Sequence, residues 1–404
     1  MNKEIKKTKI KRLRFPEFHN NPDWSERKLS EVLTEHGLKS DGSEQVFSVS
    51  VHKGVINQIE HLGRSFSAAS TGHYKRVVPG DIIYTKSPTG DFPYGIIKQS
   101  KVSMPVIVSP LYGVFTPETT ALGYIIDSYF ESAENAFNYL SSIVQKGAKN
   151  TINITNETFL SKSLVLPTNN KEQQKIADCL SSLDDLITAE TGKLKALKSH
   201  KKGLMQQLFP AESETVPKLR FAEFRDSGEW EEKTLKSVSK MQAGKFVSAS
   251  EIKENRSDDL YPCYGGNGLR GYTNSYTHTG TYSLIGRQGA LCGNVTLADG
   301  RFHATEHAVV VTPVKDVDTK WLFYMLNYLN LNQYATGQAQ PGLSVENLEK
   351  VQINIPASEK EQQKIASCLS SLDEHITAQA EKIEALKQHK KGLMQGLFPE
   401  VKEA

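Results

Sequence analysis

The chain has 404 residues, of which 38% are apolar and 24% charged, and this length is enough for two to four domains. No stretch approaches the roughly 18 apolar residues of a membrane span, and no signal-peptide core follows the lysine-rich start, so we expect a cytoplasmic protein without membrane contact. The net charge of +3 is too small to indicate a nucleic-acid partner by itself, so any basic surface must be local.

Residues 1–165 are predicted to form a first α+β domain. It opens with the segment Arg12-Leu-Arg-Phe-Pro-Glu-Phe18, and Trp24 follows. Apolar runs flanked by turn residues predict strands at Gly80–Tyr84 and Leu164–Pro167, and Phe137–Val144 has a helical apolar pattern.

Basic and amide side chains of this domain are interleaved with tyrosines and are the candidates for contacts with DNA. Such basic residues mostly contact phosphate, and ordinary solvated surface positions are the alternative interpretation. The principal candidates are Lys53, Gln58, Arg64, Lys75, Arg76 and Lys86, with His52, His61 and Lys98 as further members.

Residues 166–210 are predicted to form a long helix, which Phe209-Pro210 ends because proline blocks the preceding turn. Its apolar residues alternate by threes and fours, the spacing of a coiled-coil seam. The seam consists of Ile176, Leu180, Leu183, Ile187, Glu190, Leu194, Leu197, Lys201 and Leu204.

Residues 211–355 are predicted to form a second α+β domain, which repeats the opener as Lys218-Leu-Arg-Phe-Ala-Glu-Phe224 followed by Trp230. Strands are predicted at Tyr282–Gly286 and Ala308–Thr312, and a helix at Trp321–Leu329.

Two segments of this second domain, Tyr264–Tyr272 and Ile285–Gly289, are interpreted as glycine-rich loops. Arg pairs with guanine edges, and Asn or Gln with adenine edges, so these loops carry the side chains that direct base reading uses. The candidates are Asn267, Arg270, Tyr272, Arg287 and Gln288, with ordinary loop polarity as the alternative.

Residues 356–404 contain a second long helix, and Lys360–Pro399 is identical to Lys171–Pro210 at 30 of 40 positions. Its seam consists of Ile365, Leu369, Leu372, Ile376, Gln379, Ile383, Leu386, Lys390 and Leu393. If the two helices pair antiparallel, a register with Glu190 opposite Lys390 also sets Lys201 opposite Gln379, and we predict this register. The alternative is that each helix only covers its own domain.

A search for catalytic constellations finds none. The Gly265–Gly271 segment lacks the strand and the Lys-Thr pair of a phosphate cradle, and Asp318-Thr-Lys320 lacks the partners of a nuclease motif. No CxxC spacing suggests zinc, and the four cysteines are expected to be reduced thiols. We therefore predict no catalytic residues and no metal site.

The repeats with KEQQKIA at their starts and GLMQ near their ends, the openers, and Gln340-Pro-Gly-Leu-Ser344 resemble the specificity subunit of type I restriction-modification systems. The resemblance implies two target-recognition domains, each reading half of an asymmetric bipartite site, on an antiparallel coiled coil with pseudo-two-fold symmetry. It also implies double-stranded DNA, two methyltransferase subunits and motor-nuclease restriction subunits as partners. The chain itself would hold no cofactor, since S-adenosylmethionine, ATP and magnesium would belong to those partners.

Two competing hypotheses remain. An enzyme, a nuclease or a methyltransferase, is disfavoured by the motif search and by the absence of the Asn/Asp-Pro-Pro-Tyr motif of adenine methyltransferases. A coiled-coil adaptor that binds only proteins is the second, and sequence-selective protection of DNA would distinguish it from the resemblance.

Overall fold

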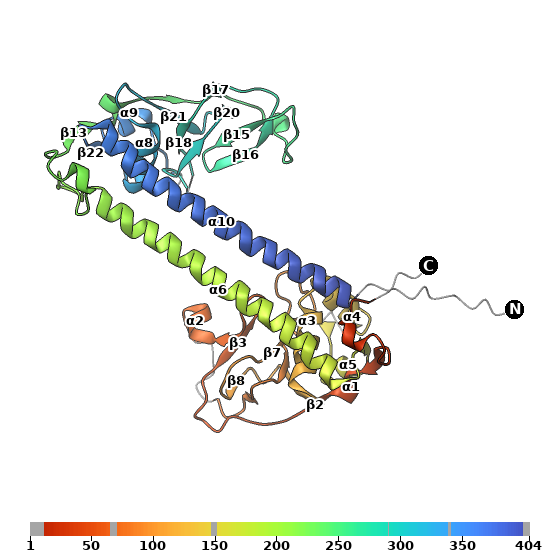
Figure 1. Ribbon diagram of the computed structural model, residues 1–404. Helices are drawn as coiled ribbons and strands as arrows, with labels where there is room; N and C mark the ends of the chain where they lie inside the picture. Colours follow the sequence, from red (N-terminus) through yellow and green to blue (C-terminus); the bar gives the residue numbers. More distant parts are fainter. Residues whose placement is uncertain (1–11, 65–70, 147–151, 290, 338–340, 399–404) are drawn as a thin grey trace. The chain divides into compact units, whose positions relative to one another are not determined.

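Figure 1 shows the computed structural model, which describes residues 12–64, 71–146, 152–289, 291–337 and 341–398. The chain divides into two compact units. The first comprises Met1–Ala189 with Ile383–Ala404, and the second comprises Glu190–Lys382. Each unit therefore contains one α+β domain and a stretch of both long helices.

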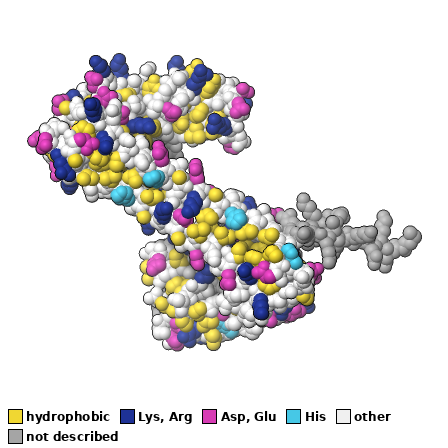
Figure 2. Space-filling model, viewed as in Figure 1, with side chains coloured by type: hydrophobic (Ala, Val, Ile, Leu, Met, Phe, Trp, Pro, Cys, Tyr) yellow, Lys and Arg dark blue, Asp and Glu magenta, His cyan; other side chains and the backbone are white. Residues whose placement is uncertain are grey.

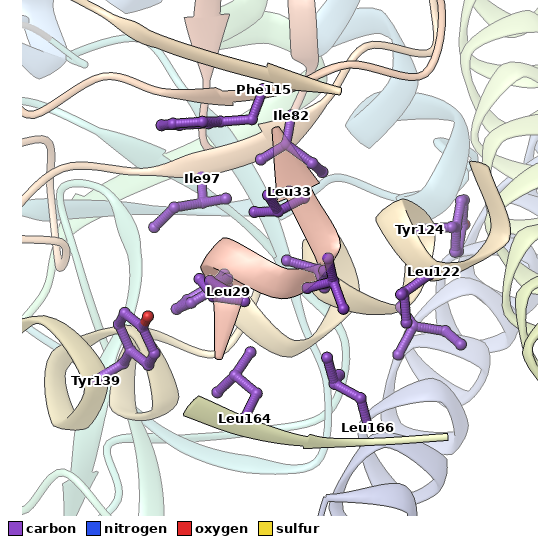
Figure 3. Close-up of a cluster of buried hydrophobic side chains, with 14 of the residues drawn as sticks. Leu29, Leu33, Ile82, Ile97, Phe115, Leu122, Tyr124, Tyr139, Leu164 and Leu166 are labelled. Atoms are coloured by element: carbon purple, nitrogen blue, oxygen red, sulfur yellow. The ribbon is translucent and has the colours of Figure 1, made fainter. Parts of the chain in front are cut away.

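The centre of the first unit is an antiparallel four-stranded sheet. Its strands lie in the order β2 (Leu33–Glu35), β9 (Gly113–Pro117), β6 (Ile82–Tyr84) and β7 (Ile97–Gln99). Helix α3 (Thr120–Phe130) packs against β7, and nine of its residues are buried. In Figure 3, Leu122 from α3, Leu33 from β2 and Ile82 from β6 point into one cluster of buried side chains.

The sequence predicted parts of this unit. The strand expected at Gly80–Tyr84 is β6, and the one expected at Leu164–Pro167 is β12 (Ser163–Leu166). The helix expected at Phe137–Val144 begins earlier, as α4 (Ala133–Ser141), because the Ser132 hydroxyl caps its first turn by accepting from Asn135 N at 3.2 Å. Helix α3 was not predicted.

Smaller elements complete the first unit. Two-stranded antiparallel pairs join β1 (Ser25–Lys28) to β12, β3 (Phe47–Ser50) to β4 (Gly54–Asn57), β5 (Lys75–Val77) to β8 (Val106–Val108), and β10 (Gln145–Lys146) to β11 (Ile152–Asn153). The short helices are η1 (Pro16–Phe18), α1 (Leu29–Val32), α2 (Gln58–Leu62) and α5 (Asn156–Leu160).

The second unit repeats this frame. Its antiparallel sheet has the order β14 (Ser239–Ala243), β21 (Ala308–Pro313), β18 (Tyr282–Gly286) and β19 (Val295–Ala298), and β13 (Glu231–Thr234) pairs with β22 (Gln352–Ile355). The helices are η3 (Ala222–Phe224), α7 (Leu235–Val238), η4 (Ala249–Glu251), α8 (Thr319–Tyr328), η5 (Leu331–Tyr334) and α9 (Val345–Glu349).

A second sheet without a counterpart of the same size in the first unit completes this domain. Its order is β16 (Gly268–Thr273), β15 (Tyr261–Gly265), β20 (Arg301–Ala304) and β17 (His278–Thr279), and β15 and β20 form its parallel pair. The strands and the helix predicted for this domain are found as β18, β21 and α8.

The openers and the helix starts repeat together because they bind each other. Arg14 donates to both carboxylate oxygens of Glu172 at 2.7 and 2.8 Å, and Trp24 Nε1 donates to the same carboxylate at 2.9 Å. Glu172 is 1% exposed, and its hydrogen bonds raise the pKa of the Arg14 guanidinium. The second unit has the same cluster, formed by Arg220, Glu361 and Trp230.

The two long helices, α6 (Asn170–Leu208) and α10 (Glu359–Leu397), pair antiparallel within each unit. In the first unit Asp184 of α6 contacts Lys390 of α10, and in the second Lys201 contacts Asp373. Every seam residue named above is buried or half-buried. The predicted fold class, α+β domains with an antiparallel coiled coil, is confirmed.

The predicted helix register is wrong. Glu190 accepts from Gln379 Nε2 at 2.6 Å and pairs with Lys382, instead of lying opposite Lys390. Lys201 pairs with Asp373 at 2.6 Å rather than with Gln379. The prediction compared only seam positions, whereas Asp184, Asp373 and Lys382 flank the seam and determine the pairing.

Candidate DNA interface

Of the two segments interpreted from sequence as glycine-rich loops, Tyr264–Tyr272 is part of a β-hairpin. Strands β15 and β16 pair from Tyr261 with Thr273 to Gly265 with Gly268, so only Gly266 and Asn267 form the turn. Gly268 has φ +84°, a conformation that glycine adopts without strain. The prediction missed the strands because glycines within a strand resemble loop composition.

The glycines of this region allow close packing inside the protein. A Cβ at Gly286 would overlap the carbonyl oxygen of Gly266, and a Cβ at Gly271 would lie 2.5 Å from the carbonyl oxygen of Lys253. The end of β18 therefore rests directly on the hairpin turn, which fixes the tip of the hairpin on the domain.

The hairpin tip borders an open hollow with a volume of about 670 Å³. Its lining includes three of the five residues predicted for this domain, Asn267, Arg270 and Gln288, all of them exposed. The structure therefore brings together side chains that the sequence placed on separate segments.

Besides four glycines, two further residues line the same hollow, Leu269 and His307, and neither was predicted to contact DNA. Leu269 is 51% exposed, and the His307 Nε2 atom lies 3.2 Å from Glu306 Oε1. The sequence gives little indication of either residue. For Leu269, the surrounding sequence does not distinguish a leucine on an exposed strand from a leucine in the core.

An asparagine-rich hollow of about 240 Å³ adjoins the hairpin turn at Asn267. Asn267 lines both hollows, and Asn294 of the second hollow donates to Asn267 Oδ1 at 3.3 Å. The other polar residues of this second hollow are Thr296, Asn327 and Asn330. Amide side chains offer donors and acceptors without charge, which suits contacts with base edges.

Arg287 and Tyr272 lie outside the lining of these hollows. The Arg287 backbone donates to His307 O at 3.0 Å and accepts from Leu343 N at 2.9 Å, and its side chain is half-buried. Gly289 N also donates to Pro341 O, so Pro341–Leu343, part of the motif seen in the sequence, holds the loop that carries Gln288. Gln340 lies outside the described residues.

The candidates of the first domain lie on several elements. Lys75 on β5 donates to Tyr112 O at 2.7 Å. Burial lowers the pKa of both the Lys75 and the Lys86 ammonium groups. Arg76 forms ion pairs with Glu44 at 2.9 Å and Asp41 at 3.4 Å. The charges of Lys75 and Arg76 thus already have partners within the domain.

The remaining candidates of the first domain include more accessible positions. Lys53 is exposed between β3 and β4, Gln58 begins α2 and donates to Ser48 Oγ at 3.3 Å, and Arg64 is exposed after α2. Lys98 is buried and forms ion pairs with Asp127 and Glu131, both at 3.5 Å, so its inclusion as a further candidate was wrong.

The charges of the visible surface are mixed. Figure 2 shows Lys and Arg side chains interspersed with Asp and Glu on the face drawn, in line with the small net charge. Within the described residues, no helix is long and apolar enough to cross a membrane, and no group of three His, Cys, Asp or Glu side chains could hold a metal ion. The four cysteines are free, and Cys263 and Cys292 are buried.

Comparison with known proteins gives one consistent family. The family model described as "Type I restriction modification DNA specificity domain" matches residues 73–199 and 227–388, more than half of the chain. The specificity subunit of the type I restriction enzyme EcoprrI from Escherichia coli is 48% identical over 149 residues, 37% of each chain. The MjaVIII specificity subunit of Methanocaldococcus jannaschii is 27% identical over 252 residues, 55% of this chain and 58% of its own.

Solved structures agree in fold. The S subunit of a type I restriction-modification system from M. genitalium has a TM-score of 0.64 at 14% identity, covering 95% of this chain and 98% of its own. A chain from a study of type I system assembly has a TM-score of 0.54 at 16% identity, with 93% and 98% covered. The sequence matches cover 37% and 58% of the two curated relatives' own lengths.

Proposed function

The chain belongs to the type I restriction modification DNA specificity family, and from this premise we propose that its two domains each read one half of an asymmetric, bipartite DNA site. The observation that carries the proposal is the repeated frame with unlike additions. Both units have the same four-stranded sheet order and the same opener-to-helix cluster, but the sheet with the β15–β16 hairpin belongs to the second. Identical frames with different exposed surfaces suit one task performed on two targets.

The hollow at the hairpin supports the DNA-reading part of the proposal. It gathers an arginine and two amide side chains on an exposed surface, and these side chains form paired hydrogen bonds with guanine and adenine edges. The candidates of the first domain, Lys53 and Arg64 among them, remain proposed contacts, chiefly with phosphate.

We assign the long helices the task of spacing and docking. Each has 39 residues and is about 58 Å long at about 1.5 Å per residue. The proposed partners are two methyltransferase subunits and motor-nuclease subunits, which would bring S-adenosylmethionine, ATP and magnesium. The chain itself is proposed to perform no chemistry and to act in the cytoplasm, where the chromosome lies.

A map of adenine methylation across the genome, in cells with and without the chain, tests this function. The proposal expects a two-part motif that is methylated only when the chain is present. Purified chain alone, incubated with DNA and S-adenosylmethionine, should transfer no methyl group. A complex that assembles but protects no specific DNA sequence would support the protein-only adaptor instead.

A further inference from the structure

The β15–β16 hairpin exposes a leucine between two residues of the base-reading type. Leu269 lies two residues after Asn267 and directly before Arg270, and all three line the hollow. With 51% of its surface exposed, Leu269 is far more accessible than the apolar residues of the adjacent core, such as Leu284 at 2%. Single exposed leucines are common on protein surfaces, so the geometry of the hairpin has to decide its meaning.

A β-bulge determines where Leu269 and Arg270 point. Along β15, Tyr264 pairs with Leu269 and the preceding Cys263 pairs with Gly271, so Arg270 is the extra residue. In a regular strand two consecutive side chains point to opposite faces, whereas a bulge redirects one of them. Here Leu269 and Arg270 are both exposed, and Gly271 after them is buried.

Backbone hydrogen bonds join the strand beside the bulge to a neighbouring segment. Tyr272 and Lys253 exchange two backbone hydrogen bonds of 2.8 Å, directly after the bulge. The absence of a side chain at Gly271, whose φ is +153°, lets this contact form, because a Cβ there would lie 2.5 Å from Lys253 O and 2.7 Å from Ile252 Cγ2. The strand that carries Leu269 is thus joined to the segment at Lys253 directly after the bulge.

An apolar side chain beside an arginine and an amide fits one feature of DNA. The major groove admits a two-stranded β-ribbon, and thymine alone among the four bases places a methyl group on its edge there. From this geometry we infer that Leu269 packs against the C5 methyl group of a thymine in the half-site read by the second domain, while Arg270 and Asn267 contact neighbouring base edges. The inference rests on the proposed function, which it makes specific at one base.

Removal of single methyl groups from the DNA tests the inference. The full chain, purified with its methyltransferase partners, is bound to duplexes in which each thymine of the half-site is replaced in turn by deoxyuridine. We expect one replacement to weaken binding by the wild-type complex about three- to tenfold, the effect of one or two buried carbon atoms. In the Leu269→Ala complex the same replacement should have no effect.

Leu291→Ala provides the matched control. Leu291 lies in the same unit with 49% of its surface exposed, and it does not line the hollow. Its substitution should leave the deoxyuridine penalty unchanged. Leu269→Val, which keeps an apolar contact, should retain part of the penalty, and equal thermal unfolding midpoints would show that all variants fold.

Two outcomes separate this inference from the function on which it rests. The first outcome is a wild-type complex that prefers its site over a scrambled duplex, while Leu269→Ala removes no thymine-specific penalty or the half-site contains no thymine. That outcome overturns the Leu269 inference alone. If the wild-type complex shows no preference for any sequence, the proposed function fails as well.

Discussion

Lys390 Nζ lies 2.6 Å from Asp184 Oδ1, and the repeat reproduces this ion pair in the second unit as Lys201 and Asp373, at the same distance. The repeat offset of 189 residues (373 − 184) relates both partners. Each aspartate also accepts from a tyrosine of its own domain, Tyr124 for Asp184 and Tyr324 for Asp373. The pair therefore ties the helices to each other and to the domain.

Lys390→Met is expected to destabilise the protein more than Lys201→Met. Lys390 also contacts Glu131 at 2.7 Å and is 12% exposed. Its removal takes the shortest ion pair from two partly buried carboxylates and leaves them the longer pairs with Lys98, at 3.5 Å, and Lys101, at 3.6 Å. Burial alone would lower the pKa of Lys390, but Glu131 and Asp184 outweigh it and raise the pKa. We expect a loss of about 2–4 kcal/mol for Lys390→Met.

Lys201→Met serves as the matched control for that measurement. Its partner Asp373 is 38% exposed and can be solvated by water, so the expected loss is about 1 kcal/mol or less. Urea unfolding of both variants measures the difference. Equal losses would show that the burial of the first pair has no energetic consequence.

The Asp184 pair is also expected to make stability depend on pH. Burial alone would raise the pKa of Asp184, but hydrogen bonds from Lys390 and Tyr124 outweigh it and lower the pKa. Because the pKa of Asp184 is lower in the folded protein than in the unfolded chain, where it is about 4, the aspartate stabilises the folded state above about pH 4. This contribution is lost as the pH falls through the pKa of the folded state. The pKa of Asp127 shifts upward, so the comparison must isolate Asp184.

Asp184→Asn isolates this contribution. Wild type should exceed the variant in unfolding free energy by about 1–2 kcal/mol at pH 6, and the difference should shrink below about pH 4. Urea titrations between pH 6 and pH 3.5 would measure it. A difference that stayed constant, or grew toward low pH, would contradict the assigned pKa direction.

Glu361→Gln is expected to weaken the cluster that joins the second opener to α10. The change keeps the shape of the side chain but removes its charge and one of the two carboxylate oxygens that accept from Arg220. The expected loss is about 2–3 kcal/mol, because Glu361 is 1% exposed. Glu359→Gln, on the exposed first turn of the same helix, should change the unfolding free energy by less than about 0.5 kcal/mol.

Arg270→Ala is expected to relax one position of the half-site read by the second domain, by about 1–3 kcal/mol. The sequence indicates Arg270 and Arg287 alike as candidates, and of these two arginines Arg270 is the one that lines the hollow. Methylation maps of cells with Arg270→Ala and with Arg287→Ala would show which arginine determines a base of the motif. An unchanged motif and unchanged affinity for Arg270→Ala would remove that residue from the reading surface.

The first half of the chain, residues 1–210, is predicted to form an antiparallel homodimer through its own helix. The repeat offset maps Lys390 onto Lys201, so Asp184 of one copy would face Lys201 of the other, twice. Two identical readers on a two-fold axis would then read an inverted repeat. Light scattering and a methylation map check the dimer and its palindromic site.

A charge exchange tests the contact in that homodimer. Lys201→Glu should dissociate the fragment, and Asp184→Lys in the same chain should restore the dimer by reversing both charges. A fragment that stays monomeric without any substitution would contradict the helix pairing on which the prediction rests.

The repeats made the frame predictable, since 30 of 40 identical positions and two similar openers required two copies of one architecture. The register was not predictable, because it depends on Asp184, Asp373 and Lys382 beside the seam. The hollow was only partly predictable. Asn267, Arg270 and Gln288 were recognised by their chemistry, but the exposure of Leu269 depends on a bulge that strand periodicity does not reveal.

Exchange of the second domain alone tests the central claim, that two independent readers share one repeated frame. Residues 239–343, from β14 to the segment behind the hollow, would be replaced by the corresponding residues of a relative with a different methylation motif, and the genome would be mapped for adenine methylation. The account predicts that one half of the bipartite motif changes while the other half and the gap remain as in wild type. A change in both halves together would contradict it.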